Sequence, residues 1–315
     1  MTMKTQKKMQ LWGNLMLLLT AMIWGAGFVA QSAGMEYVGP FTMQACRFFL
    51  SGLVLLPIIA LRGRSGKGAA RPAAREDGKR LLVRGSVCGV LLFAASSFQQ
   101  FGLLYTTVGK SGFLTALYIL IVPVLGLLLH QRVGRGVWIG VALSLAGLYF
   151  LCLSGGTDGI NPGDLLTLAC ALFFALHIQY IDRVSGDVDC VQLSCVQFFV
   201  NALLSAVCMA LFEAPSWSAV ASCWLPIMYA GVLSGGAAYT LQIVGQQYTS
   251  PTLASMLLSL ESVFAALFGA ILIPEQALQG REIFGCTLMF AAIVLAQLPE
   301  KTKTQRAESA RKNTF

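Results

Sequence analysis

Apolar residues run along this chain in ten long stretches separated by short polar segments. A helix needs roughly 20 apolar residues to cross a bilayer, and each stretch has about that length. Lipid offers no hydrogen-bond partners to the backbone, which favours helices, and the sequence lacks the alternation of a membrane β-barrel. The pattern predicts an all-α membrane protein with ten transmembrane helices at about residues 11–31, 41–60, 85–106, 111–129, 136–154, 163–181, 190–211, 222–246, 252–273 and 283–298.

The composition excludes an ordinary soluble enzyme. Hydrophobic residues make up 56% and charged residues 11% of the 315 residues, whereas a typical soluble domain carries roughly 25% charged residues. So few charges do not cover a water-facing surface. The net charge of +8 would indicate nucleic-acid binding in a soluble protein, so the positions of the basic residues decide what it means.

The basic residues lie almost entirely on one side of the predicted membrane. With the N-terminus in the cytoplasm, all but three of the 22 Lys and Arg residues fall in cytoplasmic segments, the exceptions being Arg47, Lys110 and Arg281. Cytoplasmic loops carry such an excess of bases. We therefore expect a bacterial inner (plasma) membrane protein with both termini in the cytoplasm and no nucleic-acid partner. The basic stretch 61–80 acts as a topology signal alone or also binds acidic membrane lipids.

Sequence signatures of a metal centre, a cofactor or an enzyme are absent. The nine cysteines form no Cys-x-x-Cys pair, and the two histidines, His130 and His177, belong to no His-Glu-x-x-His motif. Neither a Gly-x-Ser-x-Gly elbow nor a phosphate-binding Gly-x-x-x-x-Gly-Lys loop occurs. We expect no metal, no cofactor and no enzymatic activity.

The second half of the chain repeats the first. Residues match at an offset of 150 in the first stretches of each half, and at offsets of 143 or 145 further on. The matches include Gly13 with Gly163, Phe48–Phe49 with Phe198–Phe199, Gln99 with Gln242, Gly102 with Gly245, and Gly140 with Gly285. This spacing predicts two five-helix repeats, at 1–154 and 155–298, and a disordered cytoplasmic tail at 299–315.

Because five is odd, the second repeat enters the membrane from the opposite side and the halves are inverted. Inverted repeats are typical of secondary transporters, which bind substrate near the membrane midplane between the halves. The sequence therefore predicts a secondary active transporter that exports or exchanges a small organic metabolite by alternating access. A non-transporting membrane sensor or scaffold that binds a small molecule stays open as an alternative. Besides the substrate, the expected partners are membrane lipids and the proton as a candidate coupling ion, with the chain a monomer or homodimer.

Several motifs resemble the drug/metabolite transporter (DMT) superfamily, in particular its EamA-type members. They are Trp24–Gly25, Arg47–Phe48, AGLY at 146–149, SGFLTALYILIVP at 111–123 and LASMLLSLESVFAALFGAILIPE at 253–275. The resemblance covers about residues 11–298 and implies ten helices and export or exchange of small metabolites, often amino acids or drug-like compounds. Ser262 stands where the family often has Pro, and a helix without that Pro is expected to kink less.

Two charged residues lie well inside predicted spans, Glu261 and Arg47. A buried ionisable residue in a membrane is a candidate functional group. Glu261 is either a proton carrier or a structural carboxyl group held by neighbouring helices. Arg47 either attracts a substrate carboxylate or pairs with Glu261 as a fixed strut. The repeat places Gln197 opposite Arg47 and Tyr118 opposite Glu261, so each charge occurs in one half alone.

Six further residues in the spans are candidates for the site. Gln99 and Gln242 occupy matching positions and either bind a polar substrate or hydrogen-bond between helices. His177 either exchanges protons near neutral pH or has a packing role. The aromatic candidates, which either wall an amphipathic site or belong to the core, are Trp24, Tyr118 and Tyr239.

Overall fold

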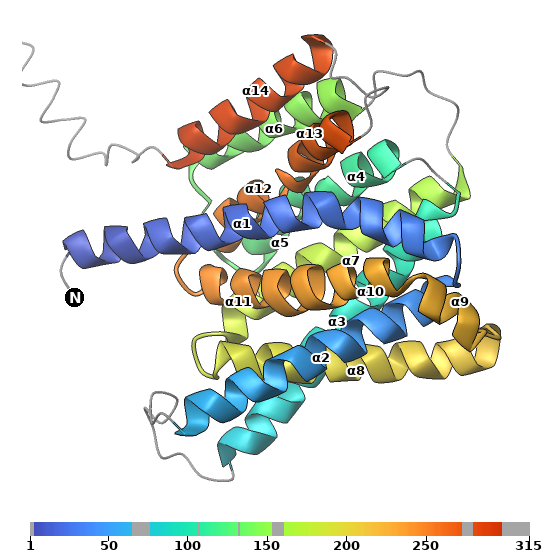
Figure 1. Ribbon diagram of the computed structural model, residues 1–315. Coiled ribbons are helices and arrows are strands. Elements are labelled where there is room, and N and C mark those ends of the chain that lie inside the picture. Colours follow the sequence, from blue (N-terminus) through green and yellow to red (C-terminus); the bar gives the residue numbers. More distant parts are fainter. Residues whose placement is uncertain are drawn as a thin grey trace, which may run out of the picture.

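The computed structural model describes residues 3–64, 76–105, 108–131, 133–152, 161–272 and 280–297. Within these ranges every regular element is helical, as the sequence predicts (Figure 1). The predicted tail at 299–315 and residues 65–75 of the basic stretch lie outside the described residues.

The helices follow the predicted apolar stretches. Those of the first half are α1 (Met3–Met35), α2 (Pro40–Arg64), α3 (Glu76–Leu103), α4 (Val108–Ala116), α5 (Tyr118–Leu128) and α6 (Arg135–Cys152). Those of the second half are α7 (Pro162–Val184), α8 (Cys190–Phe212), α9 (Trp217–Ser222), α10 (Trp224–Met228), the π-helix η1 (Tyr229–Tyr239), α11 (Thr240–Gln246), α12 (Pro251–Leu258), α13 (Glu261–Leu272) and α14 (Gly280–Gln297).

Eight helical segments in the described part of the chain are long and apolar enough to cross a membrane. The predicted spans 136–154 and 283–298 are not among the eight. They correspond to α6, whose apolar stretch Arg135–Phe150 is shorter, and to α14, which packs against α6. The structure thus supports eight of the ten predicted crossings, and the other two stay a prediction.

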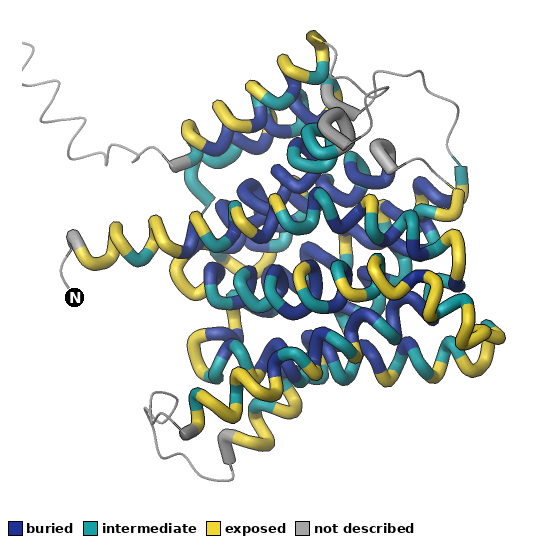
Figure 2. Tube along the Cα trace, viewed as in Figure 1, coloured by how far each residue is buried: buried dark blue, intermediate teal, exposed yellow. Residues whose placement is uncertain are grey.

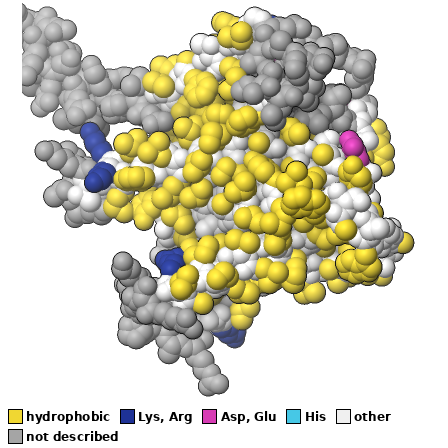
Figure 3. Space-filling model, in the orientation of Figure 1, with side chains coloured by type: hydrophobic (Ala, Val, Ile, Leu, Met, Phe, Trp, Pro, Cys, Tyr) yellow, Lys and Arg dark blue, Asp and Glu magenta, His cyan; other side chains and the backbone are white. Residues whose placement is uncertain are grey.

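The outside of the bundle has the apolar surface that lipid requires. Buried residues lie mainly where helices face one another, and exposed ones point outward (Figure 2). Hydrophobic side chains cover most of the described face in Figure 3, while Lys and Arg side chains gather at its left and lower left. Large apolar side chains such as Leu211 and Trp217 are 71% and 84% exposed. Such extended apolar surface is unusual for a soluble monomer.

Helices of the two halves pack in matched pairs. α2 packs on α8 and α6 packs on α14, so each of these pairs joins equivalent helices. In the repeat, α1 corresponds to α7, and α3 corresponds to η1 and α11 together. α1 contacts η1 and α11, and in the same way α7 contacts α3. In Figure 1, α6 and α14 form one edge of the bundle, α2, α3 and α8 lie towards the other edge, and the remaining long helices lie between.

The glycine matches of the repeat occur at close helix contacts. A Cβ atom on Gly13 would lie 2.8 Å from the Gly245 carbonyl oxygen, and one on Gly163 would lie 2.7 Å from that of Gly102. The repeat pairs Gly13 with Gly163 and Gly102 with Gly245. The two contacts are therefore the same contact between the halves, made twice, and both require residues without side chains.

Two helices break at matching positions. α4 and α5 are separated at Leu117, and α12 and α13 at Ser259–Leu260, so Tyr118 and Glu261 each begin the second segment. The expected straighter helix at Ser262 is therefore wrong. The Ser259 hydroxyl donates to the Met256 carbonyl at 2.8 Å, and Ser262 N–H reaches only the Ser259 carbonyl, three residues back. Serine hydroxyl and tight-turn bonds thus accompany the break without a proline.

Candidate functional site

A cavity lies between the two halves, where the broken helices face α1, α2 and η1. Its lining combines apolar and aromatic side chains with a few polar ones, a composition typical of small-molecule sites. Seven of the eight candidate residues line it. The complete lining is Trp24, Phe28, Gln31, Arg47, Gln99, Tyr118, Phe174, Ile178, Ser234, Tyr239, Gln242, Leu258 and Glu261.

Glu261 and Tyr118 form the hydrogen-bonded pair of the cavity. The Tyr118 hydroxyl donates to Oε1 of Glu261 at 3.2 Å, and Glu261 is only 4% exposed. Tyr118 begins α5 and Glu261 begins α13, so both lie directly after a helix break that faces the cavity. The pair gives the carboxyl group one neutral donor and no charged partner among the ion pairs of the described residues.

Arg47 is held by Gln31 and not by Glu261. Its Nη1 donates to Gln31 Oε1 at 2.6 Å, and the guanidinium lies 4.5 Å from the centroid of the neighbouring Phe48 ring. The fixed strut between Arg47 and Glu261 is therefore not formed in this conformation, although both side chains line one cavity. Gln31, near the end of α1, is the acceptor within reach of Arg47 in the N-terminal part of α2. The Gln31 amide nitrogen also donates to the Gly27 carbonyl.

Aromatic side chains form one wall of the cavity around Tyr239. Its ring centroid lies 4.5 Å from that of Trp24 and 6.1 Å from that of Phe48. Trp24 Nε1 donates to the Ser234 carbonyl at 3.1 Å, which fixes the indole against η1. The Trp24 and Tyr239 rings, which line the cavity, provide the apolar body of a binding site with few polar groups.

The two matched glutamines line the cavity from α3 and α11. Gln99 Nε2 donates to the Thr115 hydroxyl at 3.5 Å, whereas Gln242 Nε2 donates to Gln246 Oε1 at 3.0 Å. Within the described parts of the chain, Gln242 Oε1 has no hydrogen-bond partner although it is buried. One of the two amides thus retains an acceptor for a ligand.

His177 lies outside the cavity. Its Nε2 is 3.0 Å from Gln197 Oε1, and the imidazole is fully buried. This pair joins α7 to α8 much as the Gln31–Arg47 pair joins α1 to α2. The position of His177 favours the packing role over a direct role at the site.

The π-helix η1 contributes Ser234 and Tyr239 to the cavity. Three of its carbonyl groups accept hydrogen bonds from other helices. The pairs are Ser51 with Gly231 at 2.8 Å, Trp24 with Ser234 at 3.1 Å, and Thr20 with Ala238 at 3.0 Å. A π-helix is an uncommon element that is often found at functional sites.

The sequence reasoning missed six lining residues, namely Phe28, Gln31, Phe174, Ile178, Ser234 and Leu258. The repeat would have revealed Phe174, because it lies 150 positions after the candidate Trp24, whereas Ile178 corresponds to Phe28, which was itself missed. Gln31 carried a weaker signal as a polar residue at the end of the first predicted span. Nothing in the sequence distinguished Ser234 or Leu258 from other small or apolar residues.

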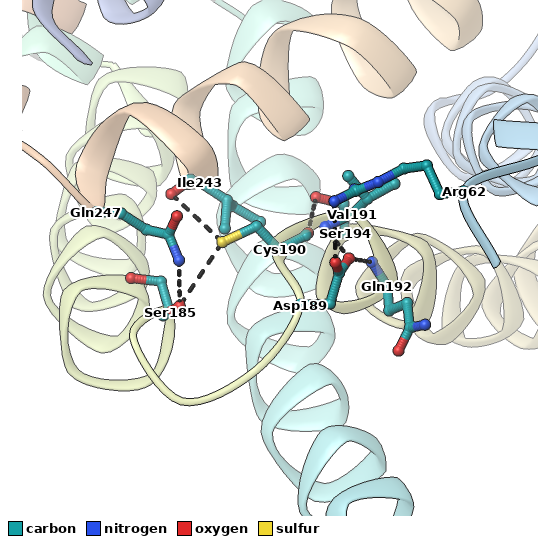
Figure 4. A network of polar contacts seen from close by, with 9 residues as sticks. All are labelled: Arg62, Ser185, Asp189, Cys190, Val191, Gln192, Ser194, Ile243 and Gln247. Carbon is teal, nitrogen blue, oxygen red and sulfur yellow. Dashed lines mark hydrogen bonds and ion pairs between the residues drawn. The ribbon is translucent and has the colours of Figure 1, made fainter. Parts of the chain in front are cut away.

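A second polar cluster joins the ends of α2, α7, α8 and α11, away from the cavity (Figure 4). Asp189 accepts from the first backbone N–H groups of α8 and pairs with Arg62 at 3.2 Å. Gln247 and Cys190 both contact the Ser185 carbonyl oxygen. In the described ranges no group of three or more His, Cys, Asp or Glu side chains could hold a metal ion.

Comparisons with known proteins bear on the family and the fold of the chain. The model of the EamA-like transporter family matches residues 11–153 and again residues 161–298. An uncharacterized transporter of Archaeoglobus fulgidus is 32% identical over 92% of this chain and 87% of that protein. The uncharacterized inner membrane transporter YedA of Escherichia coli K12 is 25% identical over 94% and 93%. A solved crystal structure with 23% identity has the same fold, with a TM-score of 0.73 over 90% of this chain and 96% of that one.

Proposed function

Because this chain belongs to the EamA-like transporter family and is a multi-pass membrane transporter, we propose that it is a secondary active transporter. It exports or exchanges a small organic metabolite by alternating access. It lies in a bacterial inner membrane with both termini in the cytoplasm. Its ten helices form two inverted five-helix repeats, at 1–154 and 155–298.

The observation that carries this proposal is the cavity between matched halves that holds Arg47 and Glu261. Secondary transporters place substrates between their repeats, beside discontinuous helices. Here the breaks before Tyr118 and Glu261 occur at equivalent positions and both open onto the cavity. Charged groups inside a membrane protein are expensive to keep, which supports a functional role for these two.

Two observations support the inverted repeat. The family model matches the chain twice, and exchanging the two halves would leave the same pairs of helices in contact. The concentration of Lys and Arg in alternate loops supports the orientation. Rocking of one half against the other would then expose the cavity to each side in turn.

Glu261 is the proposed site of proton coupling. A carboxylate in a low-dielectric cavity is more costly than the neutral acid unless it is paired. Among the described residues, the hydrogen-bond partner of Glu261 is the neutral hydroxyl of Tyr118. A proton taken up at one membrane face and released at the other would therefore accompany the movement of substrate.

Counterflow in proteoliposomes tests the proposed function. Purified full-length protein is reconstituted, and the uptake of labelled amino acids and other small metabolites is measured against a load of the unlabelled solute. The matched variants are Gln99→Leu, in the cavity, and Gln100→Leu, the neighbouring buried residue outside it. We expect counterflow in the wild type and in Gln100→Leu and a loss in Gln99→Leu. Specific binding with no counterflow of any solute would instead favour a sensor.

A further inference from the structure

One of the three guanidinium nitrogens of Arg47 is hydrogen-bonded by the protein, and the other two are not. Arg47 and Gln31 are 3% and 6% exposed, and the bond between them uses Nη1 alone. The remaining donors, Nε and Nη2, are buried and have no hydrogen-bond partner among the residues described. A buried cation that lacks partners is strongly unfavourable, so a ligand for this edge is expected.

The two unbound nitrogens lie on the same edge of the guanidinium plane. That edge presents two parallel N–H groups, which match the two oxygens of a carboxylate in a bidentate pair. Gln31 occupies the opposite side, and its own Nε2 contacts the Gly27 carbonyl at 3.4 Å. The amide is thus held between Gly27 and Arg47, and it fixes the plane of the guanidinium.

No acidic side chain of the described ranges pairs with this edge. The ion pairs of the described ranges are Arg62–Asp189 and Arg84–Asp187, both outside the cavity. Glu261, the one acid that lines the cavity, is bonded to Tyr118. The counter-charge for Arg47 is therefore available from a ligand, while Trp24 and Tyr239 offer an aromatic wall for the rest of it.

We propose that the substrate is a small organic carboxylate with an apolar or aromatic body, bound through its carboxylate to Nε and Nη2 of Arg47. Gln31 is the positioning residue that holds this edge towards the ligand. That the ligand is a transported substrate rests on the proposed function. That it binds here rests on the cavity alone.

The second half of the chain offers a matched control. The Gln197–His177 pair at 3.0 Å is equally buried and joins the same two helices of its own half, but neither residue lines the cavity. Gln197→Leu removes a buried polar bond of the same kind as Gln31→Leu does. An effect of Gln31 on helix packing alone would appear in both variants.

Equilibrium binding to the purified protein tests the proposal without a transport assay. The probes are 3-phenylpropionate, indole-3-acetate and phenylalanine, each compared with its primary amide, which has the same size but no carboxylate. Binding is measured from the ligand-dependent rise in the midpoint of thermal unfolding. Hydrogen bonds to charged groups are worth about 1.5–3 kcal/mol, so we expect at least one acid to bind about tenfold tighter than its amide.

The variants should change this ratio selectively. In Arg47→Lys, which keeps the charge but lacks the fork, and in Gln31→Leu, the ratio of acid to amide affinity should fall towards one. In Gln197→Leu it should stay at the wild-type value. Equal affinities for acids and amides in the wild type, or an unchanged ratio in Arg47→Lys, would overturn the proposal.

The outcomes separate this inference from the transport function. Counterflow of a solute without an acid group, unaffected by Arg47→Lys, would keep the transporter and overturn the carboxylate site. Carboxylate binding that depends on Arg47 in a protein without counterflow would keep the site and overturn transport.

Discussion

Tyr118 donates a hydrogen bond to Glu261 at 3.2 Å, and the two residues occupy the same position in the two halves of the chain. Phe48 and Phe198 are equivalent too, and their rings stack with centroids 6.0 Å apart. Equivalent residues of the two halves that contact each other lie where the two halves face one another. Two carboxylates there would repel each other. A tyrosine opposite a single glutamate avoids this repulsion, which gives the unequal charge of the halves a physical reason.

Glu261→Gln is expected to remove proton coupling while substrate exchange persists. The amide keeps the size of the side chain and accepts the Tyr118 bond, but it neither binds nor releases a proton. Transport driven by a pH gradient should be lost, and counterflow at equal pH should continue and become independent of pH between roughly 5 and 8. Measurements on the same proteoliposomes check both. Retention of the wild-type pH profile in this variant would exclude Glu261 as the proton site.

Arg47→Gln and Glu261→Gln are expected to act independently on stability. The two side chains line one cavity but bond to different partners, Gln31 and Tyr118. Effects of residues without direct contact usually add within about 0.3–0.5 kcal/mol. The two single variants and the double variant are compared by denaturant unfolding in detergent. A double variant that is more stable than the sum of the singles by over about 1 kcal/mol would reveal a direct ion pair.

Arg62→Gln is expected to loosen the polar cluster of Figure 4 with little loss of overall stability. Arg62 and Asp189 are 43% and 31% exposed, and exposed ion pairs contribute less than about 1 kcal/mol. Cys190 is buried in the same cluster, so easier opening should speed its modification by a maleimide. Peptide mass spectrometry compares Cys190 with Cys208 further along α8, whose rate should not change. Equal modification rates of Cys190 in the wild type and the variant would show that the Arg62–Asp189 pair does not help to shield Cys190.

Glu213→Ala is expected to destabilise the start of α2. The Glu213 carboxylate accepts hydrogen bonds from the backbone N–H groups of Phe41 and Thr42, both at 2.8 Å, and from the Thr42 hydroxyl at 2.6 Å. Loss of a helix N-cap costs about 0.5–2 kcal/mol. A lowered midpoint of thermal unfolding is the readout. Glu213→Gln retains an acceptor oxygen and should show a smaller loss, and equal effects of Ala and Gln would contradict the capping role.

The helical framework could be predicted from the sequence because lipid imposes its pattern on every span. Each of the ten predicted apolar stretches is mainly helical where it is described, apart from short breaks such as those at Leu117 and Ser259–Leu260. The repeat paired Gly13 with Gly163 and Gly102 with Gly245, but the structure was needed to show that these glycines lie where the halves touch. The helix break before Glu261 was not predicted, because it follows from serine hydroxyl and backbone bonds that a proline rule does not consider.

The residues of the site were easier to predict than their partners. Charges such as Arg47 stand out in an apolar span, and seven of the eight candidates line one cavity. Arg47 bonds to Gln31 and not to Glu261 because the relative position of α1 and α2 decides which acceptor is nearer. His177 lies outside the cavity because the rotation of α7 about its axis directs this side chain towards Gln197 on α8. Neither quantity can be read from spacing along one helix.

The π-helix η1 determines which side chains at its end and in α11 face the cavity. A π-helix accommodates extra residues in its turns compared with an α-helix, and one residue corresponds to a rotation of about 100° in an α-helix. If η1 tightened to α-helical turns, Tyr239 and Gln242 would rotate away from the positions that they hold in the lining of the cavity. The donors Thr20, Trp24 and Ser51 lie on α1 and α2, so these first-half helices help determine which face of a second-half helix the ligand meets.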